Sequence, residues 1–300
     1  MVTSLTHRSG THLNGDVSSL VNGIFFGYVV STVLLGITIV QGWIYLHDNR
    51  DRWTIRTFIA VLIILDIAET CCSTQLLHHY LILHFGDFEV LLRFSNVISA
   101  DFAITGTIFF LVHLYYARRL VIVGRSWWLP GIIVALTIAM LVVGICTIAV
   151  RAQADVFGGL EQKETKILLT MFHVLAVLID VLITAGLTVT FSTTQTEFQK
   201  TRSILQRLVL YTASRGILIT VVQIGHIVMY LVQPTNFLFW LSIHLSLSKL
   251  YVISTLATLN SRASLHNDDG VIEVLRFAHT KSNSSIPSGD DIRGQSVADA

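Results

Sequence analysis

The fold is decided by a segment without a single charged residue, residues 128–150, which reads WLPGIIVALTIAMLVVGICTIAV. A helix needs about 20 apolar residues to cross the hydrocarbon core of a bilayer, and this segment has that length. The whole chain shares its character, because 53% of its 300 residues are hydrophobic, only 13% are charged and the mean hydropathy is +0.67. Soluble domains carry about 25% charged residues. The composition therefore predicts a protein that lives in lipid.

Apolar segments of similar size recur on both sides of residues 128–150, with short polar breaks between them. Because lipid offers backbone N–H and C=O groups no hydrogen-bond partner, each segment must be a helix. The sequence predicts an all-α integral membrane bundle of seven transmembrane helices, at about Leu20–Leu46, Thr54–Leu83, Leu91–Tyr116, Trp128–Val150, Lys166–Phe191, Ile204–Val232 and Asn236–Thr258.

The orientation of the bundle follows from the Lys and Arg residues in its predicted loops. One face receives Arg50, Arg52, Arg56, Arg118, Arg119, Arg125, Lys200, Arg202, Arg207 and Arg262. The other face receives only Arg8, Arg93, Arg151, Lys163 and Lys166. Cytoplasmic loops carry the excess of basic residues, so the richer face is expected in the cytosol, with the N-terminus outside and the C-terminus inside.

Three regions follow from this topology: a short extracellular or lumenal tail at residues 1–19, the membrane domain at 20–262, and a cytosolic tail at 263–300. The last region is rich in Ser, Asn, Asp and Gly, a composition typical of disorder. Its Asn283-Ser284-Ser285 sequon would stay unmodified in the cytosol, so a glycan there would reverse the orientation. We expect residence in the plasma membrane or another membrane of the secretory pathway.

Several function classes find no support in the sequence. A net charge of +1 gives no basic field for nucleic acid. No nucleophile motif, zinc-protease motif or phosphate-binding glycine loop is present, so we expect neither an enzyme nor a cofactor. His78, His79 and His84 cluster in the sequence, but the first two point to different faces and no other ligand completes a zinc set. No metal site is predicted, and we expect His113, His226 and His244 to be satisfied interior groups.

The most informative residues are ionisable ones inside the predicted spans. They converge near the middle of the membrane, because a helix rises about 1.5 Å per residue. Facing lipid, each would cost roughly 2.5 to 3.5 kcal/mol, so all are expected to face the bundle interior. This candidate polar site consists of Asp66, Glu69, Asp101, Asp180, Arg215 and Lys249.

Four carboxylates in this set face two cations, and an apolar interior does not tolerate the two surplus charges bare. Protons or a bound cation should neutralise them. One interpretation is a fixed network that only sets helix register, and the other is a functional cavity for an ion, a proton or a small ligand. A retinal Schiff base on Lys249 is disfavoured, because the residue one turn earlier is Leu245 where microbial retinal proteins carry aspartate.

Small residues follow one another at four-residue spacing in two predicted helices. Gly23, Gly27 and Ser31 form one stripe, and Ser95, Ser99 and Ala103 form another. Such stripes let helix backbones approach closely in a bilayer. We interpret them as packing surfaces within the bundle, with dimerisation as the alternative.

Spaced elements along residues 20–262 resemble a large fungal family, expanded in basidiomycetes, of integral membrane proteins known only as a domain of unknown function. The matching residues are Gly36, Gln41, Tyr45, Asp51-Arg52-Trp53, Asp66, Tyr80, Phe85-Gly86-Asp87, Tyr116 to Arg118, Asp180, Thr201, Leu208, Tyr211, Gly216, Lys249-Leu250-Tyr251 and Ser254 to Arg262. Ile253 departs from the family, which usually has Asn there. The resemblance implies seven helices and supplies no activity.

Three functions remain open at this point. The first is a receptor-like or sensory membrane protein, with a polar cavity for a small ligand and a cytosolic partner at the basic loops. The second is a transporter or channel that moves protons or cations over the buried carboxylates. The third is a scaffold in which the charges only hold helices together. The lipid bilayer is the one partner common to all three, and the oligomeric state is left open.

Overall fold

The computed structural model describes residues 6–48, 51–83, 96–124, 127–152, 163–193, 199–232 and 240–261. Apart from Asp51, Arg52, Gly124 and Trp127, all of these are helical, which confirms the all-α class. Side chains are described from Asn22 onward in the first helix and from Ala213 onward in the sixth long helix. The predicted helix starts at Leu91 and Asn236, and the predicted tail at 263–300, lie outside the described residues.

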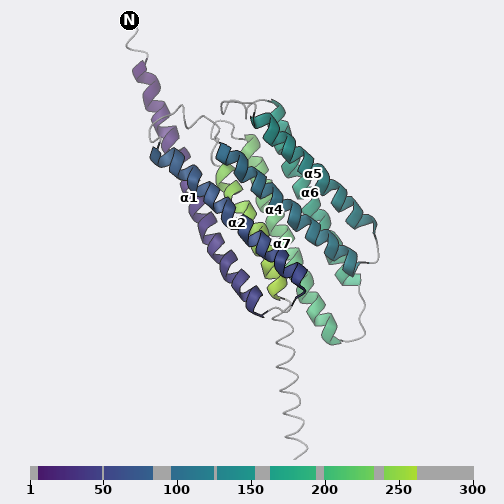
Figure 1. Ribbon diagram of the computed structural model, residues 1–300. Helices are drawn as coiled ribbons and strands as arrows, with labels where there is room; N and C mark the ends of the chain where they lie inside the picture. Colours follow the sequence, from purple (N-terminus) through teal and green to yellow (C-terminus); the bar gives the residue numbers. More distant parts are fainter. Residues whose placement is uncertain are drawn as a thin grey trace, which may run out of the picture. The chain divides into compact units, whose positions relative to one another are not determined.

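The described helices lie along one another as a bundle (Figure 1). They are α1 (Thr6–Asp48), α2 (Trp53–His78) with the π-helical turn η1 (His79–Leu83), α4 (Asn96–Val123), α5 (Trp128–Ala152), α6 (Lys163–Thr193), α7 (Gln199–Val232) and a further helix at residues 240–261. Successive long helices from α1 to α7 contact one another, and α4 also contacts α6. This arrangement brings distant parts of the chain to a common interior.

Five stretches are long and apolar enough to cross a bilayer, which indicates an integral membrane protein. They are Asn22–His47, Asn96–Val123, Trp128–Arg151, Lys163–Thr190 and Ala213–Val232. Each overlaps a predicted span. The other two predicted spans correspond to α2 with η1 and to residues 240–261, which are helical but are not among the five.

Helix ends differ from the predicted ones at functionally relevant places. The third predicted helix was to end at Tyr116, but α4 continues to Val123, so Arg118 and Arg119 lie within it and Arg119 is buried. Likewise α5 runs to Ala152 and includes Arg151, which is buried rather than in a loop. The first helix begins at Thr6 and takes in most of the predicted tail at 1–19. A change from apolar to basic residues in the sequence therefore does not mark the end of a helix here, because the basic side chains Arg119 and Arg151 are themselves buried within the helix.

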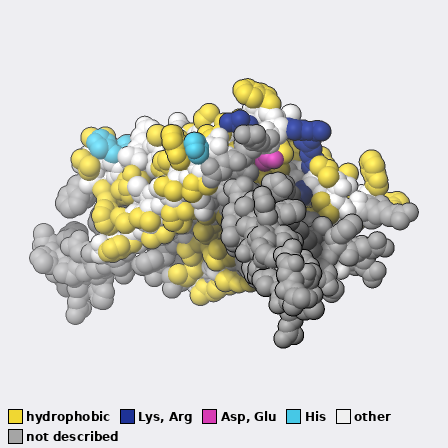
Figure 2. All heavy atoms as spheres, turned by 90° about the horizontal axis from the view of Figure 1, so that it is seen from below, with side chains coloured by type: hydrophobic (Ala, Val, Ile, Leu, Met, Phe, Trp, Pro, Cys, Tyr) yellow, Lys and Arg dark blue, Asp and Glu magenta, His cyan; other side chains and the backbone are white. Residues whose placement is uncertain are grey.

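Large apolar side chains cover the outside of the bundle, the reverse of a soluble protein. Phe26, Val33, Ile64 and Ile217 are all more than 60% exposed, and they come from three different helices. Figure 2 shows hydrophobic side chains spread over much of the described surface on the face that it presents. Lipid tails are the natural partner of such a surface, because they satisfy apolar groups as well as a protein core does.

The helix at residues 240–261 occupies the interior of the bundle, since none of its residues is exposed. Its Leu245 carbonyl accepts a hydrogen bond from Ser31 of α1. Its own side chains Lys249, Tyr251 and Ser254 contact α2, α6 and α7 in that order. Its polar side chains therefore face protein rather than lipid. This position explains how a helix that carries Lys249 and several serines can belong to a membrane bundle.

The predicted stripe of Gly23, Gly27 and Ser31 packs on this central helix, which confirms its role within the bundle. The Ser242 hydroxyl donates a 2.6 Å hydrogen bond to the carbonyl of Gly23, and the Ser31 hydroxyl donates one of 3.0 Å to that of Leu245. Between them, a Cβ atom on Gly27 would lie 2.5 Å from the Ser242 Cα. The two backbones therefore touch only because this position lacks a side chain.

We expect Gly27→Ala to destabilise the protein by about 1–3 kcal/mol, because the added methyl group meets backbone and forces the helices apart. Gly36→Ala is the matched control in the same helix, since its Cβ would meet nothing within 4 Å. Thermal unfolding followed by size-exclusion chromatography of heated detergent samples measures the difference. Equal midpoints for the two variants would contradict the close helix contact.

Candidate functional site

The six predicted site residues are all buried in the bundle. Asp66, Glu69 and Lys249 are fully inaccessible, and Arg215, the most accessible of the six, is only 7% exposed. They come from α2, α4, α6, α7 and the central helix. The expectation that these charges face the interior is confirmed, and their contacts divide them into three groups.

The first group is an ion-pair cluster around Lys249. Its ammonium lies 3.2 Å from Asp66 Oδ1, contacts Glu69 Oε2, and donates a 2.9 Å hydrogen bond to the backbone carbonyl of Asp66. One cation thus joins two carboxylates that lie three residues apart on α2. The Lys249 ammonium is therefore the counter-ion of the two carboxylates of α2, Asp66 and Glu69.

The second group centres on Asp101 in α4. The Ser73 hydroxyl lies 3.2 Å from Asp101 Oδ1 and 3.3 Å from Glu69 Oε1, so it connects this carboxylate to the Lys249 cluster. The other oxygen of Asp101 lies 3.5 Å from His244 Nε2 on the central helix. The imidazole of His244 therefore lies beside the carboxylate of Asp101, a contact that the sequence alone did not predict.

The third group centres on Asp180 in α6. The Tyr251 hydroxyl donates a hydrogen bond to its Oδ2, while His113 Nε2 lies 3.5 Å from its Oδ1. Tyr251 in turn accepts a 2.9 Å hydrogen bond from the side-chain amide of Gln223. Asp180, like Asp101, therefore has a histidine beside it.

Arg215 pairs with an aromatic ring and a hydroxyl. Its guanidinium lies 3.7 Å from the centre of the Tyr116 ring, and its Nε donates a 3.0 Å hydrogen bond to Ser254. Arginine is suited to this position, because a planar guanidinium stacks on an aromatic face while it donates in its own plane.

Taken together, these contacts form a nearly continuous polar path through the bundle. Gln223 extends it, because its Oε1 accepts a 3.1 Å hydrogen bond from Nδ1 of His173. His173, His226 and His244 then lie ring against ring, with ring centres 4.2 Å apart for the first two and 5.7 Å for the last two. The path runs through Asp180, Tyr251, Gln223, His173, His226, His244, Asp101, Ser73, Glu69, Lys249 and Asp66.

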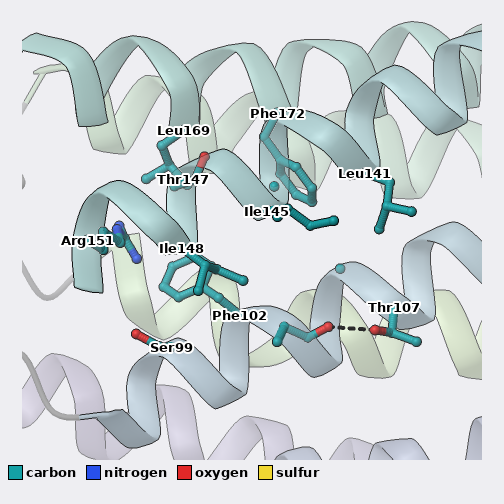
Figure 3. A pocket seen from close by; sticks show the side chains of 13 residues that line it. Ser99, Phe102, Thr107, Leu141, Ile145, Thr147, Ile148, Arg151, Leu169 and Phe172 are labelled. Carbon is teal, nitrogen blue, oxygen red and sulfur yellow. Dashed lines mark hydrogen bonds between the residues drawn. The ribbon is translucent and has the colours of Figure 1, made fainter. Parts of the chain in front are cut away.

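A separate cavity of about 260 Å³ lies between α4, α5 and α6 (Figure 3). Its walls are almost entirely apolar, and none of the six predicted residues lines it. Arg151 lies at one end, while Leu141 and Thr107 lie at the other. The Arg151 guanidinium is stacked 4.4 Å from the centre of the Phe102 ring. The cavity is thus an apolar slot with a cation at one end.

Two aromatic side chains connect this cavity to the polar path. Phe102 lines the cavity, and its ring centre lies 4.2 Å from that of His244. Phe172 lines it as well, and its ring packs edge-on against His173 at 5.2 Å. A molecule that moves either ring therefore acts directly on the histidines.

The histidines that cluster in the sequence are His78, His79 and His84. His78 is exposed at the end of α2, His79 is half-buried, and His84 lies outside the described residues. In the described part of the chain, the group of histidines that gathers closely is the buried trio of His173, His226 and His244. The sequence holds one indication of this trio. His173 precedes Asp180 in α6, His226 follows Arg215 in α7, and His244 precedes Lys249 in the central helix. Because successive helices run in opposite directions, all three histidines are displaced toward the same end of the bundle.

Residues 176–264 match the model of a family of unknown function, DUF6534. The chain is similar to that family over most of α6, all of α7 and the central helix. The matched stretch contains Asp180, Arg215, His226, His244 and Lys249, but not the residues of α2 and α4 that face them. No curated protein and no solved structure matches the chain.

We expect Lys249→Met to destabilise the protein by about 3–5 kcal/mol, because Asp66 and Glu69 lose the cation that makes their burial tolerable. Adding Asp66→Asn and Glu69→Gln to that variant should recover much of the loss, since no buried charge then lacks its partner. Lys166→Met, at the start of α6, is the control. Thermal midpoints of the purified proteins test this, and a triple variant less stable than Lys249→Met would contradict the pairing.

Proposed function

We propose that this chain is a receptor-like, non-catalytic seven-helix membrane protein that binds an anionic single-chain amphiphile in the cavity between α4, α5 and α6. The observation that carries the proposal is an apolar slot inside a membrane bundle that ends at a buried arginine. An acyl chain matches the walls, and a carboxylate or phosphate head matches the guanidinium.

The surroundings of the cavity support a ligand that arrives from the bilayer. Ile145, one of its lining residues, is 58% exposed on the apolar outer surface, so the slot borders lipid. Binding sites of small ligands are mostly apolar, with a few placed polar groups that fix orientation. Arg151, Thr147 and Ser99 lie toward the same end of the slot and are suited to that role.

A route from binding to response is supported by the two shared aromatic rings. An acyl chain in the slot contacts Phe102 and Phe172, which pack against His244 and His173. These histidines join the central helix and α6 to the polar path. Occupancy of the slot would thereby shift the packing of the central helix, which makes a sensory role the best-supported function. The cytosolic partner proposed from the basic loops would read this shift.

We further propose that all seven long helices span the bilayer, with the N-terminus outside and the C-terminus in the cytosol. The helices at Trp53–Leu83 and 240–261 have sufficient length, and their charges are turned inward and paired with each other. The resemblance to the fungal seven-helix family is proposed to extend beyond residues 176–264 to the whole bundle, since Asp66 and Asp180 both take part in the polar path.

Binding of radiolabelled palmitate and of 1-acyl lysophosphatidate to the full chain in nanodiscs tests the ligand class. We expect saturable binding that Arg151→Gln weakens about ten- to hundredfold, because a charge-assisted hydrogen bond contributes about 1.5–3 kcal/mol. Gly106→Leu should abolish binding by filling the slot, since a Cβ there meets only the Phe172 ring at 3.8 Å.

Matched controls separate these effects from general damage. Arg118→Gln removes an exposed arginine of α4, and Gly36→Leu adds the same bulk at an open position of α1. Both should bind as the unmodified protein does. No saturable binding of either amphiphile, or equal affinity after Arg151→Gln, would refute the proposal, and preference for one probe identifies the headgroup.

Proton transport is the second candidate, because the polar path joins carboxylates, imidazoles and hydroxyls across five helices. Such chains of titratable groups mark proton relays in membrane proteins. In this function His113 and His244 would exchange protons with Asp180 and Asp101.

Liposomes with purified protein and an internal pH-sensitive dye distinguish the two functions. A transporter should dissipate an imposed pH gradient, and Asp180→Asn should abolish that flux, whereas Glu164→Gln at the exposed start of α6 should not. Absence of flux in any gradient would reject transport and leave the receptor-like function.

A further inference from the structure

Three buried histidines from three different helices meet in the core of the bundle. His173 belongs to α6, His226 to α7 and His244 to the central helix, and none is more than 1% exposed. One ring nitrogen or more of each lies close to the others, within 4.8 Å across the whole trio. Imidazoles are costly to bury together unless something satisfies their nitrogens, because each buried polar atom without a partner loses its hydration.

Several of these nitrogens have no hydrogen-bond partner among the described residues. They are Nε2 of His173 and both ring nitrogens of His226 and of His244. Since Nδ1 of His173 donates its proton to Gln223 Oε1, its Nε2 carries a free lone pair. The Nε2 atom of His244 lies 3.5 Å from Asp101 Oδ2, and with the proton on this Nε2 the Nδ1 atom would carry a lone pair. The trio therefore presents imidazole nitrogens with lone pairs, which are suited to bind a cation.

The same contacts form the outer shell that a metal site requires. Ligating histidines almost always donate their other N–H to a carboxylate or carbonyl, which fixes the tautomer and the ring plane. Gln223 does this for His173, and Asp101 is placed to do it for His244. Two of the three imidazoles are thus already oriented by neighbours that are buried themselves.

The carboxylates near the trio favour a cation at this place. Over the described residues, the buried acids Asp66, Glu69, Asp101 and Asp180 are equal in number to the buried cations Arg119, Arg151, Arg215 and Lys249, so the position of the carboxylates matters here and not the total charge. A cation at the trio would lie next to Asp101 and would be connected to Asp180 through Gln223 and Tyr251. These two carboxylates face imidazoles, and they would offset the charge of a dication locally.

We propose that His173, His226 and His244 bind one Zn²⁺ or a similar divalent transition metal that cross-links α6, α7 and the central helix. Three imidazoles with a fourth open position are an established zinc geometry. Tetrahedral coordination at 2.0–2.1 Å separates ligand nitrogens by about 3.3 Å, so the side chains close in by up to about 1.5 Å from their 4.8 Å spacing. Rotation about the side-chain torsions provides a shift of this size.

Metal analysis of the full chain, expressed in zinc-supplemented medium and purified without chelator, tests the site. We expect about one zinc per chain in the unmodified protein and at least a tenfold lower content in His226→Gln. His113→Gln is the matched control, because His113 is equally buried but lies beside Asp180 outside the trio. It should retain the metal. The readout is independent of amphiphile binding, so the two proposals stand or fall separately.

A second measurement keeps the test decisive if His226→Gln does not fold. The thermal midpoint of the unmodified protein should fall when a membrane-permeant zinc chelator is added and return when Zn²⁺ is restored in excess. No bound metal together with no response of the midpoint to Zn²⁺ would overturn the proposal. Equal zinc content in a well-folded His226→Gln variant would do the same.

Discussion

The pairing of Lys249 with Asp66 and Glu69 is the constraint on which the rest of the bundle depends. Hydrocarbon accepts none of these groups alone, so α2 and the central helix must lie side by side at one depth and in one register. The small residues of α1 pack on the same central helix, where Gly27 admits the backbone at Ser242. The ionic cluster and this close contact together fix the positions of three helices, and the apolar surface outside them is left to lipid.

Histidines extend this constraint to the other half of the bundle. Among the described residues, no lysine or arginine forms an ion pair with Asp101 or Asp180 as Lys249 does with Asp66, and each of the two faces an imidazole instead. The distinction matters for function, because a lysine paired with two carboxylates holds helices in place, whereas an imidazole beside a carboxylate responds to protons, metals and the packing around it. The cavity lined by Phe102 and Phe172 borders this responsive half rather than the Lys249 cluster.

Sequence reasoning succeeded where a different placement of the residue would cost much free energy. A charge in the middle of an apolar segment must turn inward, so the burial of all six site residues could be predicted, as could the packing role of Gly23, Gly27 and Ser31. The prediction failed where contacts with neighbouring helices determine whether a residue is buried. Arg151 directly follows the apolar segment 128–150 and was predicted in a loop, yet α5 continues through it and the Phe102 ring covers its guanidinium. His173, His226 and His244 are separated by 53 and 18 residues, and only the alternating direction of their helices shows that they share a level.

The enclosed position of residues 240–261 bears on how the protein is made. The six long helices described before this one leave the ribosome first, and until it arrives Asp66 and Glu69 lack the ammonium ion of Lys249 that they contact in the folded protein. An α2 helix placed in lipid at that stage would need its acidic groups protonated or hydrated. The bundle is therefore completed from its C-terminal side, and a chain that stops before Lys249 leaves two acidic groups of α2 without their cation.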